Sequence, residues 1–369
     1  MNIYSYVDKY GNYTFDEVGF NEIDNAIFAS LSYLKLKKIL SKNKMTIEKV
    51  GKLYFETHPK KSREVLIIRR AIKLLRYIQN TKRYKDLKLY NYVYKKSKDE
   101  QFCALSIEIN DKLVYVSFEG TDASISGWKE DFMLTYKFPV KAQIRAVDYL
   151  NRNFLFKRKK LILGGHSKGG NLALVAAMYT VDRIKNKIIK VYNIDGPGLL
   201  KEQFESKEYA SIKDKLVHIV PNYAIVGLLL YHSDNYVVVK SAKKGAFSHD
   251  LFTWVVKDAE FVKTELDNFY KTLSDEIIKW LNQYKLEERE RFVKEMFNIF
   301  ERANIQSIKE ITENKKIILR IISESKELNE IDKIMFKDFV SMIFNCFKDV
   351  KKDEFKVFLD KKLNKTGTK

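Results

Sequence analysis

The sequence is poor in the residues that form cross-links, turns and linkers. It has only two cysteines, four prolines and 14 glycines in 369 residues. Cys103 and Cys346 lie far apart and match neither a zinc pattern nor a disulfide framework. The scarcity of proline and glycine argues against long structureless linkers. Few thiols and no cysteine framework are typical of a protein in the reducing cytosol, so we expect a cytoplasmic location.

Long apolar runs are also missing. The first residues, MNIYSYVDKYGNYTF, contain no basic stretch followed by an apolar core, so the sequence predicts no secretory signal. The longest apolar run of note is Ala224 to Tyr231, far shorter than the roughly 20 residues that span a bilayer. We therefore expect a protein without a membrane-spanning helix.

The net charge of +20 does not come from a dense basic tract. Lysines are spread through the whole chain among 48 acidic residues, and neither a zinc pattern nor an RNA-binding signature accompanies them. The simplest interpretation is a lysine-rich background composition, so we expect no specific nucleic-acid partner. Weak contact with an anionic membrane surface is the alternative that the charge leaves open.

What the sequence does contain is a large apolar fraction in three zones. Residues 1–85 show helical spacing of apolar residues, and residues 258–369 are helical and highly charged, with no strand predicted. Residues 86–257 alternate short apolar runs with helical stretches. FCALSIEI and KLVYVSFEG predict a hairpin, and LILGG, IIKVYNID, KLVHIV and YVVVKS predict further strands. This alternation predicts an α/β fold with a mostly parallel sheet flanked by helices.

The segment KKLILGGHSKGGNLALVAAMY carries the strongest chemical signal. Gly165, Ser167 and Gly169 have G-x-S-x-G spacing, between a strand candidate at Leu161 to Leu163 and a helix pattern at Asn171 to Tyr179. Such a strand–turn–helix holds the serine on a tight turn, and small residues on both sides avoid clashes between the crossing elements. The pattern predicts a nucleophilic serine on an α/β-hydrolase elbow.

Two backbone N–H groups are candidates for an oxyanion hole. One belongs to Lys168, at the start of the helix after the serine, where free N–H groups favour negative charge. The other belongs to Thr121, in the loop after the strand VYVSFEG, and its hydroxyl is a further candidate donor. Asp122 is expected to cap the next short helix. That helix, Ala123 to Phe132, would lie over the site with Trp128 on its apolar side.

SFEGTDASISGWKEDF and GGHSKGG together resemble class 3 (fungal-type) lipases over about residues 100–255. The whole chain resembles an uncharacterised bacterial lipase-like family, through FNEIDNAIFASLSYL, YNIDGPGL and SHDLFTW. The resemblance implies an α/β-hydrolase fold with helical additions at both ends. It also implies a lid at Ala123 to Phe132 whose substrate-facing side chains are Ile125, Trp128 and Phe132, and an oxyanion hole at Thr121 and Lys168.

A catalytic serine needs a histidine base, and the chain has five histidines. His58 lies in the N-terminal helical zone, His166 lies in the elbow with its side chain directed away from the serine, and His218 lies in a strand. His232 and His249 both follow the later strands, where the order Ser–Asp–His requires the base. His249, in a loop before a new helix and at the family position of the base, is the favoured candidate.

The acid departs from the class 3 pattern. Aligning the segment IVPNYAIVG puts Ala224 where those lipases have an aspartate. Asp195 is the better candidate, because it ends the strand IIKVYNID and opens on the same edge of the sheet. The alternatives are that Asp195 only caps the following Gly-Pro-Gly turn, or that Asp234 is the acid.

Together these residues predict hydrolysis of carboxylic esters, with acyl lipids as the expected substrates, by a triad of Ser167, His249 and Asp195. No cofactor or metal is expected, because no His/Cys/carboxylate cluster has metal-ligand spacing. Two alternatives remain, a non-catalytic binding module on a hydrolase fold and a peripheral membrane-surface protein. The sequence makes no prediction about oligomeric state.

Overall fold

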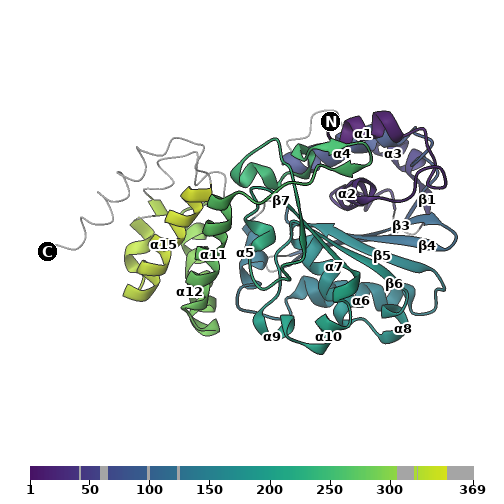
Figure 1. Ribbon diagram of the computed structural model, residues 1–369. Coiled ribbons are helices and arrows are strands. Elements are labelled where there is room, and N and C mark those ends of the chain that lie inside the picture. The colour runs from purple at the N-terminus through teal and green to yellow at the C-terminus, as the bar shows by residue number, and fades with distance from the viewer. Residues whose placement is uncertain are drawn as a thin grey trace.

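The computed structural model describes residues 1–40, 43–58, 65–97, 100–122, 125–305, 320–321 and 323–346. Its centre is an eight-stranded sheet whose strands lie in sequence order (Figure 1). The strands are β1 (Met45–Thr46), β2 (Lys88–Ser97), β3 (Glu100–Asn110), β4 (Leu113–Phe118), β5 (Lys160–His166), β6 (Ile188–Ile194), β7 (Leu216–Pro221) and β8 (Tyr236–Val239). The pairs from β4 to β8 are parallel, and those from β1 to β4 are antiparallel.

The structure confirms the predicted hairpin, which is β3 and β4, and the four later strands. Two strands, β2 and β10, differ from the prediction. β2 was not recognised, because its lysine-rich sequence is half exposed and it gains its conformation by pairing with β3. The expectation of no strand after residue 257 is wrong at β10 (Glu260–Phe261), which pairs with β9 (Val256–Lys257). Such short strands leave no alternating pattern to read.

Helices cover both faces of the sheet (Figure 1). One face carries the N-terminal helices α1 (Ile3–Tyr10), α2 (Glu22–Leu31), α3 (Ile47–Thr57) and α4 (Leu66–Ile78). The other face carries α6 (Lys141–Phe154) and α7 (Lys168–Tyr179). This is the predicted α/β-hydrolase fold with helical additions.

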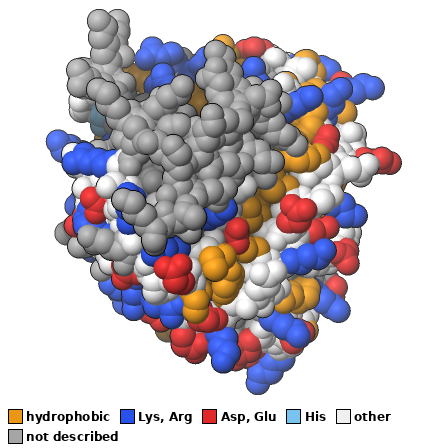
Figure 2. Space-filling model, turned by 90° about the vertical axis from the view of Figure 1, so that its left-hand side faces the viewer, with side chains coloured by type: hydrophobic (Ala, Val, Ile, Leu, Met, Phe, Trp, Pro, Cys, Tyr) orange, Lys and Arg blue, Asp and Glu red, His pale blue; other side chains and the backbone are white. Residues whose placement is uncertain are grey.

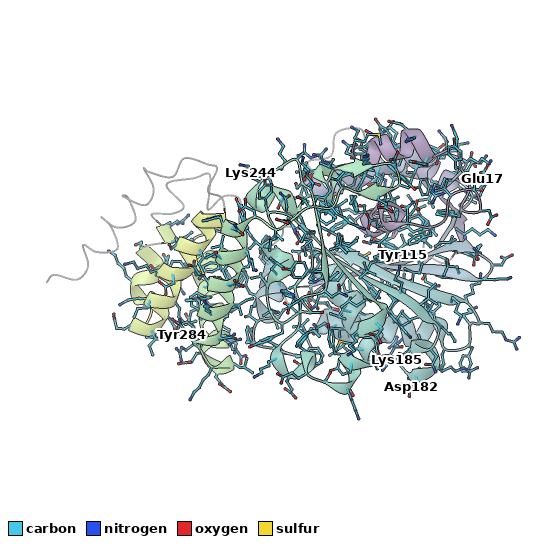
Figure 3. The ribbon with its side chains drawn as sticks, in the orientation of Figure 1. Glu17, Tyr115, Asp182, Lys185, Lys244 and Tyr284 are labelled. Carbon is cyan, nitrogen blue, oxygen red and sulfur yellow. The ribbon has the colours of Figure 1, made fainter. Side chains whose placement is uncertain are left out.

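Alternation along β4 shows how one strand serves both layers. Val114 and Val116 are buried with α6 and α7, whereas Tyr115 points to the opposite face and is buried with the N-terminal helices. The Tyr115 hydroxyl donates a hydrogen bond to Asn25 Oδ1 at 2.7 Å. Figure 3 shows Tyr115 between the sheet and α2. The N-terminal helices therefore share their core with the sheet.

The C-terminal helices form a further cluster at the end of the molecule where β5 and β6 end. They are α11 (Asn268–Asn282), α12 (Leu286–Arg302) and α15 (Glu330–Cys346), and they pack against α5 (Ile125–Met133). Figure 2 views this end, where apolar side chains lie in patches among charges of both signs.

Three short α-helices lie between β5 and β7 in the chain: α8 (Asp182–Lys185), α9 (Lys201–Phe204) and α10 (Lys207–Ala210). Within the described ranges, no helix combines the length and apolar character that crossing a membrane requires.

Candidate active site

Ser167 lies on a strained turn between β5 and α7. Its backbone has φ 59° and ψ −135°, a region that non-glycine residues rarely adopt. The Ser167 N–H donates to the carbonyl oxygen of Ile194, the last residue of β6, at 2.9 Å. This bond and the start of α7 hold the turn, and Ser167 as a whole residue is 9% exposed. The predicted elbow is therefore present as a backbone geometry.

The glycines around the serine are required by close contacts between strands and helix. A Cβ at Gly165 would lie 2.3 Å from the carbonyl carbon of Gly169, and one at Gly169 would lie 2.1 Å from the carbonyl oxygen of Phe118. Both distances are shorter than any real Cβ contact, and both involve backbone atoms that have no room to move. The prediction that small residues are needed on both sides of the serine is confirmed.

His249 and Asp195 lie together at the same edge of the sheet. His249 ends the 3-10 helix η3 (Gly245–His249), and its Nδ1 lies 2.7 Å from Asp195 Oδ2. Asp195 is 1% exposed, follows β6 directly, and has φ 46°. Its other oxygen, Oδ1, accepts the N–H of Gly227 at 3.0 Å. Both carboxylate oxygens therefore have fixed partners, one of which is the imidazole.

The alternative acids and bases lie elsewhere. Ala224 is fully buried and Asp234 is exposed. The His232 ring lies 5.7 Å from that of His218, and its Nδ1 is 3.1 Å from the carbonyl oxygen of the adjacent Ser233. His218 is 3% exposed within β7, as expected of a packed residue. By contrast, the His249 ring lies 4.5 Å from the ring of the residue that precedes Ser167.

The hydroxyl and the backbone N–H of Thr121 are not equivalent candidates for the oxyanion hole. The hydroxyl donates to Asp131 Oδ2 at 2.6 Å, so its proton is already directed to a carboxylate. A carboxylate is a strong acceptor, so the hydroxyl would have to give up this bond to donate to a substrate carbonyl, and its part in the oxyanion hole stays a prediction. The backbone N–H groups of Thr121 and Lys168 have no hydrogen-bond partner among the described residues.

The side chain of Lys168 has a role that the sequence did not indicate. It is 1% exposed, and its Nζ donates to Glu130 Oε2 at 2.9 Å and to the carbonyl oxygen of Gln101 at 3.1 Å. Glu130, on α5, also accepts the N–H of Gln101 and that of Ala142. This buried ion pair joins α7, α5 and β3 beside the elbow.

Burial shifts the pKa values of the groups around this ion pair. Burial raises the pKa of Asp131 to about 6, although nearby Lys168 opposes the shift. Burial also raises the pKa of Glu119 to about 8. For Lys168 itself, burial lowers the pKa, but the carboxylates of Asp131 and Glu130 outweigh it and leave the pKa above its ordinary value. The lysine therefore stays charged and holds together a cluster of acids.

The predicted lid helix is α5, and its apolar side is covered by the C-terminal helices. Phe132 makes edge-on contacts with Phe297 (ring centroids 5.8 Å apart) and with Phe339 (5.4 Å). Trp128 packs against the same cluster. Residues 123–124 and the side chain of Ile125 lie outside the described part of the chain. Neither Trp128 nor Phe132 is thus a freely exposed lid residue.

One residue of α12 fastens this cover to the loop that follows α5. The guanidinium of Arg289 donates to the carbonyl oxygen of Thr135 at 2.9 Å, and also to the carbonyl oxygen of Tyr284 on its own segment. Arg289 is 9% exposed, so the contact is shielded from water.

In the described ranges, no group of three or more His, Cys, Asp or Glu side chains is placed to hold a metal ion.

A family model described as Mbeg1-like matches residues 78–298, which is more than half of the chain. No curated protein matches the chain. Similar solved structures include lipase II from Rhizopus niveus, at 13% identity and a TM-score of 0.37, covering 59% of this chain and 78% of that protein. A lipase from Rhizopus microsporus var. chinensis has 15% identity and a TM-score of 0.36, covering 65% and 86%. Lip2 lipase from Yarrowia lipolytica has 11% identity and a TM-score of 0.34, covering 68% and 87%. Scores this low carry no argument about activity.

Proposed function

The chain belongs to the Mbeg1-like family, and from the geometry of its site we propose that it is a serine hydrolase that cleaves carboxylic esters. One observation carries the proposal. The imidazole of His249 is held at 2.7 Å by the buried carboxylate of Asp195, beside a serine on a strained strand-to-helix turn. The ring of His249 also lies 4.5 Å from that of His166, the residue before the serine, and acyl transfer requires a serine, a histidine and an acid together.

In the proposed reaction, the oxygen of Ser167 attacks the ester carbonyl while His249 Nε2 takes its proton. The negative charge on the carbonyl oxygen is stabilised by the N–H groups of Thr121 and Lys168. Collapse of the tetrahedral intermediate breaks the bond to the alcohol, which leaves with the proton from His249. Water then attacks the acyl carbonyl while His249 takes its proton, and collapse of the second intermediate breaks the bond to Ser167, which receives that proton as the acid leaves. Asp195 stabilises the imidazolium throughout.

We propose acyl lipids as the substrate class. Apolar side chains lie on two elements next to the site: α5 carries Trp128 and Phe132, which pack with the C-terminal helices, and the segment Ala224 to Tyr231 carries Leu228 and Leu230, both mostly buried. This segment contains Gly227, whose N–H holds Asp195, so the apolar stretch is directly connected to the acid. An apolar surrounding favours substrates with an acyl chain over small polar esters.

The test is covalent labelling with a fluorophosphonate, which reacts with activated serines. We expect the wild-type protein to be labelled and Ser167→Ala to remain unlabelled. Ser211→Ala, an exposed serine away from the site, is the matched control and should be labelled like the wild type. Hydrolysis of p-nitrophenyl esters should follow the same pattern. A folded wild-type protein that is neither labelled nor active would refute the proposal and favour a binding module.

A further inference from the structure

The histidine next to the serine makes a hydrogen bond through each of its ring nitrogens. His166 Nε2 lies 2.7 Å from the backbone carbonyl oxygen of His249, and its Nδ1 lies 3.2 Å from the hydroxyl of Tyr33. Tyr33 follows α2, in the N-terminal helical segment, and is 2% exposed. A residue of that segment thus reaches the elbow through His166.

The direction of each hydrogen bond follows from elementary chemistry. A carbonyl oxygen can only accept a hydrogen bond. His166 Nε2 must therefore carry a proton and donate a hydrogen bond to the backbone carbonyl oxygen of His249. Burial lowers the pKa of His166 well below its ordinary value, so the ring is neutral and its Nδ1 has no proton. Nδ1 therefore accepts from the Tyr33 hydroxyl. On its other side, the oxygen of Tyr33 packs closely against Gly120.

This chain of one close contact and two hydrogen bonds connects both sides of the site. It starts at Gly120, next to Thr121 in the oxyanion loop, and ends at the backbone of His249. Contact at the first end is very close, because a Cβ on Gly120 would lie 2.3 Å from the Tyr33 oxygen and 2.4 Å from the His166 carbonyl oxygen. Three segments that are distant in sequence are thereby held against one another.

We propose that Tyr33 and His166 are positioning residues for the proposed hydrolysis, in which they fix the distance between the base His249 and the oxyanion loop at Gly120. Neither side chain touches the reacting atoms in this role. Asp195 orients the imidazole of His249 from one side, and His166 holds its backbone from the other. The inference rests on the proposed function, and it gives the N-terminal helical segment a part in the site.

Positioning acts on the rate of chemistry more than on substrate binding. A reacting group misplaced by about 1 Å costs on the order of 100-fold in rate. We therefore expect His166→Ala to lower kcat by about 10- to 100-fold with KM within about twofold of the wild type. His166→Gln keeps an N–H donor near the Nε2 position but loses the acceptor for Tyr33, so it should restore part of the loss. Tyr33→Phe removes one hydrogen-bond donor and should lower kcat by about 3- to 10-fold.

Tyr115→Phe is the matched control for Tyr33→Phe. Tyr115 is also fully buried between the N-terminal helices and the sheet, and its hydroxyl also donates one hydrogen bond, but to Asn25 rather than to the site. The control should lose stability without losing kcat. Tyr33→Phe should also cost less in a His166→Ala background than in the wild type, because its effect passes largely through the imidazole.

The outcomes separate this proposal from the function on which it rests. If the wild type is labelled, and Tyr33→Phe and His166→Gln have the same kcat as the wild type, the positioning role is overturned and the hydrolase proposal stands. Losses confined to KM, or losses that Tyr115→Phe shares, would overturn it as well. A wild-type protein without labelling or turnover would overturn both. Should His166→Ala fail to fold, Tyr33→Phe and His166→Gln still decide the question.

Discussion

Replacing Asp195 by asparagine tests how the acid directs the base. In the wild type, Oδ1 accepts the N–H of Gly227 and Oδ2 faces His249 Nδ1. Asparagine has one acceptor and one donor, so its oxygen must take the Gly227 side. Its NH2 group then faces His249 and donates to Nδ1, which leaves the proton of the imidazole on Nε2. In that tautomer the base cannot accept the proton of Ser167.

The size of the effect follows from the same contacts. If the asparagine amide flips, its oxygen faces His249 and the productive tautomer is restored. Its NH2 group then faces the N–H of Gly227, so two donors oppose each other and the Gly227 N–H is left unpaired. This arrangement costs about 1 to 3 kcal/mol. Loss of the carboxylate charge beside the developing imidazolium removes a charge-assisted hydrogen bond of about 1.5 to 3 kcal/mol. Together these amount to about 2.5 to 6 kcal/mol, or roughly 10²- to 10⁴-fold in kcat.

The assay is steady-state hydrolysis of a p-nitrophenyl ester, with thermal unfolding to show that each variant is folded. Asp234→Asn makes the same charge change at an exposed carboxylate and should stay within about twofold of the wild type. Asp195→Ala has no amide to impose the wrong tautomer and should lose less activity than Asp195→Asn. A folded Asp195→Asn variant within tenfold of the wild type would refute the assignment of Asp195 as the orienting acid.

Three further predictions concern stability and surface charge. Burial raises the pKa of Glu119 to about 8 from 4.5, so the folded state loses stability as pH rises through this range. Glu119→Gln should therefore add about 3 kcal/mol to the unfolding free energy at pH 7 and almost nothing at pH 4; a gain that does not vary with pH in urea titrations would contradict this. Lys168→Met leaves Glu130 buried without its cation and should cost about 3 to 5 kcal/mol in the same measurement, whereas a loss below about 1 kcal/mol would show that the pair is dispensable. Lys243 and Lys244 are exposed on the loop that carries the base, and Figure 3 labels Lys244. Changing both to glutamate should weaken retention on anionic vesicles at low salt, and equal retention would exclude this loop from membrane contact.

The elbow could be predicted from the sequence because all of its determinants are local. A strand, a glycine-flanked serine and a helix follow one another between Leu161 and Tyr179, and the close backbone contacts leave room only for glycine. The hairpin of β3 and β4 was predictable for the same reason, since two apolar runs flank a short turn at Asp111 and Lys112. In such segments the pattern and the structure depend on the same neighbouring residues.

The partners of these local elements were not predictable in the same way. Glu130 contacts Lys168 across 38 positions, and nothing in the spacing of either residue indicates the ion pair. The same holds for Tyr33 and His166, which are 133 positions apart. The lid helix was recognised from its resemblance, but the cover provided by Phe297 and Phe339 depends on how the C-terminal helices pack. Such contacts form only when distant segments meet.

By itself, the sequence determined the strands from β3 to β8, the turn at Ser167 and the kinds of side chain available for catalysis. Only the tertiary structure decided which carboxylate faces His249, where the hydroxyl proton of Thr121 is directed, and what covers α5. The physical reason is that backbone conformation responds to residues a few positions away, whereas the geometry of a site depends on long-range packing of the whole sheet and its helices.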